Sequence, residues 1–133
     1  MKLLIPILIG LMVAGCGQSQ DQNEKWINEI IAGGLSERTE ILEDNVFSDY
    51  KVYRDGNNDG VCYEYIFSEE PSEDERSQVA GAIRGELIAG VRTITLDDQV
   101  LKAAMENGVY IRFIYKTPDG GVIVDQVVTS SDL

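Results

Sequence analysis

The feature that most constrains the fold is a pair of β-hairpin patterns, and the clearer one lies at the end of the chain. Residues 109–116 alternate, with Val109, Ile111, Phe113 and Tyr115 on one face. Residues 122–128 return as a second apolar strand, and "TPDGG" between the two segments has the composition of a turn. The pattern predicts two antiparallel strands joined by a tight turn.

A second hairpin pattern lies earlier in the chain. Residues 46–54 and 61–67 are rich in valine, tyrosine and phenylalanine, and "DGNNDG" separates them. In the later strand, Val61, Tyr63, Tyr65 and Phe67 share one face, while Cys62, Glu64 and Ile66 share the other. Such a strand is typical of a half-buried sheet.

Helical patterns surround the first hairpin. An apolar stripe runs through residues 21–32, and Gly33-Gly34 predicts the end of that helix. After the hairpin, Ser72 and Glu75 form a capping box, and Gly90 predicts the end of the helix that follows.

A further helix is predicted before the last hairpin. Thr95 and Asp98 form its capping box, and Asn107-Gly108 predicts its end. The order helix, hairpin, helix, helix, hairpin predicts an α+β domain. We expect a mostly antiparallel sheet of about four strands, made of two hairpins, with helices packed on one face.

The start of the chain has the parts of an export signal. Met1 and Lys2 precede an apolar run, residues 3–13, that is too short to span a bilayer as a helix. The run ends in Val13-Ala14-Gly15-Cys16, which resembles the lipobox of bacterial lipoproteins. In that family the cysteine thiol is acylated, as with palmitate, and the signal is cut before it. An ordinary secretory signal with an incidental Cys16 is the alternative.

The resemblance implies three segments. These are a signal peptide, residues 1–15, a lipidated Cys16 with a flexible linker, residues 16–22, and one soluble domain, residues 23–133. Several acyl chains would hold Cys16 durably in a membrane of the bacterial cell envelope. Because Gly17 rather than aspartate follows the cysteine, the resemblance implies the outer membrane, facing the periplasm.

The chain is strongly acidic, with 11 basic and 23 acidic residues and a net charge of −12. Loss of Lys2 with the signal would leave a mature protein of charge −13. Nucleic acid and anionic headgroups would repel such a domain, and a basic protein partner would be attracted. Acidity that serves only solubility is the alternative.

Composition excludes several kinds of catalysis. The chain has no histidine, which excludes Ser–His and Cys–His nucleophiles and histidine-ligated zinc. An acidic run could form a carboxylate dyad, but we interpret it as a solvated loop and helix start. This run consists of Glu69, Glu70, Glu73, Asp74 and Glu75. We therefore expect no enzyme.

Cys62 would lack a disulfide partner if Cys16 carries lipid, because the chain has two cysteines. Cys62 is then a buried small hydrophobic residue, a bridge between two chains, or a reactive thiol. Its apolar surroundings favour burial.

One loop has the composition of a calcium site. Asp55, Asn57, Asp59 and Gly60 match the start of an EF-hand loop. With Glu64, they also resemble the short extracellular calcium motif called excalibur. The matches fail at Ile66, where an EF-hand needs its bidentate carboxylate, and at Tyr63, where excalibur has cysteine. A turn that binds no ion is favoured. Calcium is the alternative, and no other cofactor is expected.

Tyrosines on the strands predict a surface for a protein partner, because tyrosine is favoured at interfaces. The residues are Tyr63, Tyr65, Tyr110 and Tyr115. We expect a lipid-anchored envelope protein with a non-catalytic, protein-binding or structural role, such as an accessory or pilot-like component of an assembly. The alternatives are an acidic inhibitor or immunity lipoprotein against a basic envelope enzyme, and a calcium-binding module using residues 55–64.

Overall fold

A computed structural model describes residues 15–133, with side chains from residue 22 onward. The expected signal peptide, apart from Gly15, lies outside the described residues, and so does the side chain of Cys16. No helix in the described part is long and apolar enough to cross a membrane.

Four strands form one sheet in the order β1-β2-β3-β4. They are β1 (Phe47–Arg54), β2 (Gly60–Phe67), β3 (Tyr110–Lys116) and β4 (Val122–Val128). The pairs β1–β2 and β3–β4 are antiparallel hairpins, whereas β2 and β3 are parallel. The predicted α+β class and the mostly antiparallel sheet are confirmed. β2 and β3 are parallel because the two helices that connect them carry the chain from the end of β2 back to the end of the sheet at which β2 begins.

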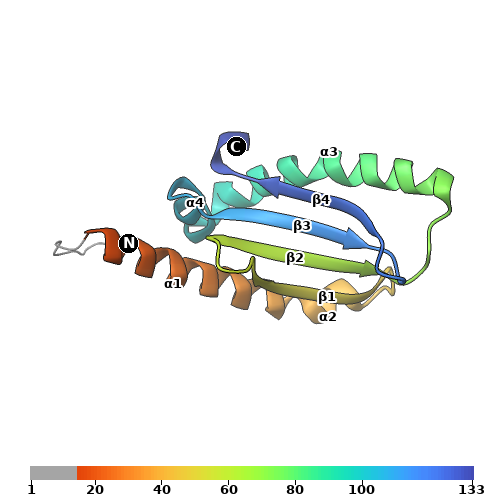
Figure 1. Cartoon of the computed structure of the whole chain (residues 1–133), viewed down its shortest axis with the longest axis horizontal. Coiled ribbons are helices and arrows are strands. Elements are labelled where there is room, and N and C mark those ends of the chain that lie inside the picture. Colours follow the sequence, from red (N-terminus) through yellow and green to blue (C-terminus); the bar gives the residue numbers. More distant parts are fainter. Residues whose placement is uncertain (1–14) are drawn as a thin grey trace.

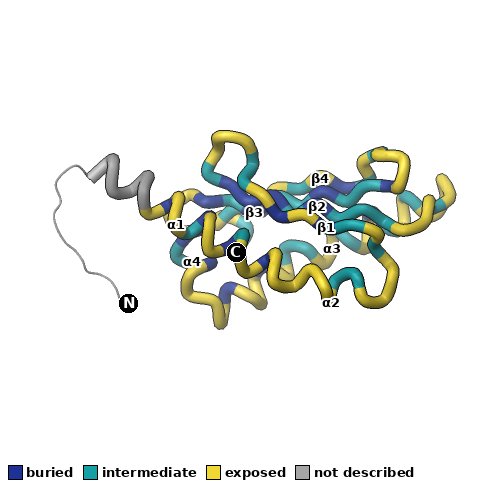
Figure 2. The backbone as a smooth tube through the Cα atoms, turned by 90° about the horizontal axis from the view of Figure 1, so that it is seen from below, coloured by how far each residue is buried: buried dark blue, intermediate teal, exposed yellow. Residues whose placement is uncertain are grey.

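The helices gather on one face of the sheet (Figures 1 and 2). They are α1 (Gly15–Ser36), α2 (Arg38–Leu42), α3 (Glu73–Asp97) and α4 (Gln99–Glu106), followed at the C-terminus by the short η1 (Ser130–Asp132). The core lies between α1, α4 and the sheet, where Ile27, Val61, Met105 and Ile111 are buried together. Burial of these side chains is the main stabilising contribution to this packing.

Helix α1 is longer than the sequence pattern predicts. It starts at Gly15, includes residues 16–22 that were expected to be a flexible linker, and continues through Gly33-Gly34 to Ser36. Gly34 does not end the helix because it serves close packing: a Cβ there would lie 3.0 Å from both Tyr63 and Val52. Contacts with the rest of the domain reach back to Asn23, whose side-chain amide donates to Asp59 and to the Asn107 carbonyl.

The boundary between α3 and α4 also differs from the prediction. The Ser72–Glu75 capping box is present, but α3 runs past Gly90 to Asp97. Thr95 is not a cap, because it is buried inside α3 and its hydroxyl donates to the Arg92 carbonyl. Asp98 interrupts the helix instead, with an extended backbone, and its carboxylate accepts the Leu101 N–H as N-cap of α4.

The other face of the sheet carries no helix of the described chain, and its side chains cover one another. Cys62 is fully buried there as a free thiol, which confirms the expected burial, and desolvation raises its pKa. Arg112 binds Asp125 through two hydrogen bonds and also binds Asp55. Glu64 is buried and accepts the hydroxyl hydrogen of Tyr53 at 2.7 Å.

Candidate functional site

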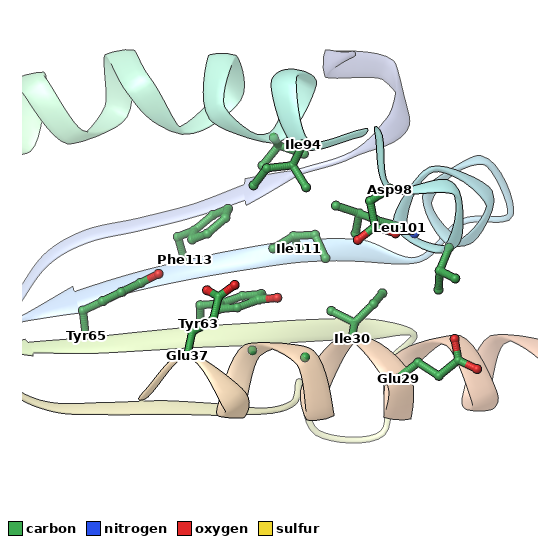
Figure 3. Close-up of a pocket in the computed structure, with 14 residues that line it drawn as sticks. Glu29, Ile30, Glu37, Tyr63, Tyr65, Ile94, Asp98, Leu101, Ile111 and Phe113 are labelled. Carbon is green, nitrogen blue, oxygen red and sulfur yellow. Dashed lines mark hydrogen bonds between the residues drawn. The ribbon is translucent and has the colours of Figure 1, made fainter. Parts of the chain in front are cut away.

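A groove of about 400 Å³ lies over the middle of the helix-covered face (Figure 3). Helix α1 packs on β1, β2 and α4, and α3 packs on β4 and α4, so the central strands stay accessible between α1 and α3. One wall is formed by α1, through Ile30, Gly33 and Gly34. Ile94 of α3 and Leu101 of α4 form the other, and β2 and β3 supply the floor.

The floor is aromatic because the parallel register places like residues side by side. Tyr63 pairs with Phe113 and Tyr65 pairs with Tyr115. The Tyr63 and Phe113 rings stack with centroids 5.5 Å apart, and the Tyr65 and Tyr115 rings stack at 4.5 Å. Such a rigid, flat surface offers apolar contact at a small cost in side-chain entropy.

Tyrosine also places a polar group on this apolar floor. The Tyr63 hydroxyl makes no hydrogen bond to any other described residue, so it is available to an occupant of the groove. Burial, followed by the negative charges of Glu37 and Asp98, raises the pKa of Tyr63 to about 12. At neutral pH this group is therefore a neutral donor and acceptor, and not a base.

Two glycines keep the groove open on the α1 side. A Cβ added at Gly33 would meet no other atom within 4 Å, and Gly34 lies against the floor. The Tyr50 hydroxyl donates to the Gly34 carbonyl at 2.9 Å, which holds the end of α1 onto the sheet. A helix with larger residues at these positions would fill the groove or stand farther from the strands.

The rim of the groove is acidic. Glu29 and Glu37 lie on the α1 side and Asp98 lies at the junction of α3 and α4, and all three are exposed. No lysine or arginine is among the described residues that line the groove. Ile94 is 54% exposed at the opposite rim from α1. The groove thus combines apolar walls with a negative potential.

The structure brings together three of the four tyrosines predicted as a partner surface. Tyr63, Tyr65 and Tyr115 lie on the helix-covered face. Tyr110 lies apart on the opposite face, where its ring covers Gly60 and its hydroxyl donates to Asp55. Tyr63 and Tyr65 are therefore reached through the groove, and Tyr115 stacks on Tyr65 beyond the residues that line it.

Three of the four predicted calcium ligands, Asp55, Asp59 and Glu64, have hydrogen-bond partners elsewhere in the structure. Asp55 binds Tyr110 and Arg112, and Asp59 binds Arg54 at 3.0 Å. Glu64 lies on the uncovered face, and Asn57 is exposed in the turn. Among the side chains of residues 22–133, no three from aspartate, glutamate or cysteine form a group that could hold a metal ion.

The acidic run acts locally. Glu75 closes the capping box with Ser72, and hydrogen bonds from Ser72 lower the pKa of Glu75. Glu70 forms an ion pair with Arg76 at 2.8 Å. These contacts agree with a helix start and a solvated loop.

Sequence patterns singled out two tyrosines of the groove floor, Tyr63 and Tyr65, but not the residues that form its walls. The pattern around Gly34 predicted a helix end, and the pattern around Asp98 predicted a different cap. A signal for the α3 wall was available in Ile94, Leu96 and Val100. Their spacing places apolar side chains on different sides of a helix, so one buried face cannot cover all three.

No protein-family model and no curated protein sequence matches the chain. The chain is similar to two solved structures. The type II secretion system pilotin AspS from Vibrio cholerae is 13% identical, with 91% of this chain and 100% of that chain covered and a TM-score of 0.45. The pilotin EpsS of the Vibrio vulnificus type 2 secretion system is 12% identical, with 85% and 96% covered and a TM-score of 0.46. At these identities and TM-scores a shared function does not follow.

Proposed function

We propose that this protein is a lipid-anchored component of the bacterial envelope that binds a protein partner through the groove between α1 and α3. The observation that supports the proposal is the accessible aromatic floor of the groove on the helix-covered face, formed by Tyr63, Tyr65 and Phe113. A concave apolar surface with a few polar groups is the usual form of a binding site. Monomeric domains otherwise cover such surfaces.

The lining residues support binding more than catalysis. The described lining has three carboxylates and two tyrosine hydroxyls, without lysine, cysteine or histidine. Tyr63 and Tyr65 both have raised pKa values, chiefly because of burial, so they stay protonated at neutral pH. Such a set lacks a nucleophile next to a base.

The acidic rim favours a partner segment that is apolar in the middle and basic at its sides. Apolar side chains would lie on the aromatic floor, and lysine or arginine side chains would reach Glu29, Glu37 and Asp98. The overall charge of −12 would attract the same partner at long range.

The first experiment compares two substitutions in α3 that add the same charge. Ile94→Asp puts a carboxylate at the groove, while Leu96→Asp alters a side chain that is 77% exposed and does not line the groove. We expect lipidated protein with Ile94→Asp to lose its captured envelope partner and the Leu96→Asp protein to retain it. Equal capture by both variants would remove the groove from the proposal.

Anchoring at Cys16 in the outer membrane is part of the proposal and is tested separately. We expect Cys16→Ser to leave an uncleaved precursor that no longer fractionates as a lipoprotein. Normal processing and fractionation of this variant would show that Cys16 is not the anchor.

An inhibitor of a basic envelope enzyme is a second candidate, because the acidic rim suits a basic active-site region. Ionic strength distinguishes the two roles. An inhibitor that acts by charge should release its enzyme at high salt and restore its activity, whereas a structural complex that rests on apolar contacts should persist.

A further inference from the structure

The two edges of the sheet differ in how their backbone groups are covered. At the β1 edge, α2 packs on the strand, and the Arg38 guanidinium donates to the Tyr50 carbonyl and to the Asp49 carboxylate. At the β4 edge, no described residue makes a hydrogen bond to the backbone of Val122–Val128 other than through the ladder with β3. The outward N–H and C=O groups of β4 are therefore unpaired.

The side chains of β4 include few of the charged residues that prevent another strand from pairing with a sheet edge. Asp125 is the single charged residue of the strand "VIVDQVV", and Arg112 neutralises it through bonds of 2.8 and 2.6 Å. Val127 is 45% exposed. The register skips Ile123, so a bulge interrupts the start of the strand and leaves Val124 to Val128 as the regular edge.

Helix α3 provides a surface beneath a fifth strand. It runs alongside β4 and extends past this edge in Figure 1, while Figure 2 places it below the sheet. A shallow depression of about 310 Å³ lies between α3 and the start of β4. Ser77, Ala80 and Gly81 line it, and a Cβ at Gly81 or Gly85 would meet nothing within 4 Å. The small residues leave room for another backbone.

Two arginines of α3 lie beside the start of β4, next to Val122 and Ile123. Arg76 and Arg84 line the depression. Arg84 forms no ion pair with any side chain of residues 22–133, whereas Arg76 forms an ion pair with the exposed Glu70 at 2.8 Å. An incoming strand with carboxylates would find partners here, while one with basic side chains would be repelled.

We propose that the β4 edge, from Val124 to Val128, accepts an extended acidic segment of a partner protein by strand addition. Backbone hydrogen bonds would provide the affinity, and Arg84 with Arg76 would select acidic side chains at the end of the segment nearest Val122 and Ile123. The groove contacts α3 at Val91 and Ile94, and the depression contacts it between Arg76 and Arg84, so the two sites share no lining residue and are separated along the helix.

Hydrogen exchange of the mature lipidated protein, which begins at Cys16, tests this proposal in detergent micelles. The probe is a synthetic nine-residue peptide that alternates valine and threonine and has glutamate at both ends, with a lysine-ended peptide for comparison. We expect the acidic peptide to slow exchange of the β4 amides and the lysine-ended peptide to have no effect. Arg84→Glu should weaken binding by about tenfold, a charge effect near 1.4 kcal/mol.

Lys102→Glu is the matched control, because it makes the same charge change on an exposed residue of α4. It should leave peptide binding unchanged. The proposal is overturned if millimolar acidic peptide leaves β4 exchange unaltered, or if both peptides bind equally. It is also overturned if β4 is protected without peptide in proportion to protein concentration, because a second copy would then occupy the edge.

Discussion

The two faces of the sheet use the same strands for different purposes. On the covered face, aromatic and aliphatic side chains meet α1 and α4 and leave the groove between α1 and α3. On the uncovered face, Glu64, Arg112 and Asp125 form ion pairs above buried apolar residues. Because successive side chains of a strand point to opposite faces, one face of this sheet can bind apolar groups while the other is exposed to water and needs no covering helix.

The uncovered face shows how a sheet can stay folded without a second layer. Cys62 and Ile114 are buried there beneath the long side chains of neighbouring strands, and no side-chain polar atom in the described part is buried without a hydrogen bond. Flexible side chains that can move to fill space provide this cover, while rigid helices cover the other face. A large-to-small substitution should therefore lower the free energy of unfolding by different amounts on the two faces.

The largest expected effect compares two isoleucines of β3. Ile111 is 2% exposed on the covered face and Ile114 is 8% exposed on the other. We expect Ile111→Ala to lower the free energy of unfolding by about 4 kcal/mol and Ile114→Ala by about 2 kcal/mol, since the flexible cover over Ile114 can collapse. Urea unfolding measures both. Equal losses would show that the two faces are equally rigid.

A smaller effect is expected for Glu64, the buried carboxylate at the centre of the uncovered face. Its partners are the Tyr53 hydroxyl and Lys116 at 3.5 Å. Glu64→Gln keeps a hydrogen-bond acceptor and removes the charge, so we expect a loss of about 1 kcal/mol in the free energy of unfolding. Glu106→Gln, on the exposed side of α4, should cost nothing measurable. A stabilised Glu64→Gln protein would contradict the interpretation of the ion pairs.

The third prediction concerns pH. Hydrogen bonds from Arg112 hold the pKa of Asp125 below its usual value of 3.8. A carboxyl group with a lowered folded-state pKa stabilises the protein above its unfolded pKa, and this stabilisation is lost as the pH falls through the folded-state pKa. We expect Asp125→Asn to cost about 0.5–1 kcal/mol at pH 7. The difference from the native protein should shrink in acid, and a difference that is constant with pH would contradict this assignment.

The smallest effect is expected from calcium, which tests the loop at the end of the uncovered face. Asp55 is held by Arg112 and Asp59 by Arg54, so a cation would have to displace two guanidinium groups. We expect millimolar calcium to leave the melting temperature unchanged, with magnesium as the control for ionic strength. A rise of several degrees that calcium alone produces would establish the calcium-binding module.

Sequence patterns predicted the elements that depend on neighbouring residues. The capping box of Ser72 and Glu75 and both hairpins are present. Gly108 and Gly120 have the positive φ values, 95° and 94°, that a helix end and a hairpin turn require. The same local rules misplaced the ends of α1 and α3, because Gly34 is needed for close contact with Tyr63 and Val52, and Asp98, not Thr95, breaks the helix.

The sequence by itself determined the strands, their alternation, the acidic charge and the absence of histidine, because each of these depends on residue identity or on spacing over a few positions. Only the tertiary structure decided that β2 pairs with β3 in parallel, which brings Tyr63 beside Phe113 and Tyr65 beside Tyr115. It also decided that α1 and α3 stand apart over those rings. The spacing between two helices that are far apart in the sequence depends on how each helix packs on its own strands. Local sequence patterns therefore cannot predict that spacing.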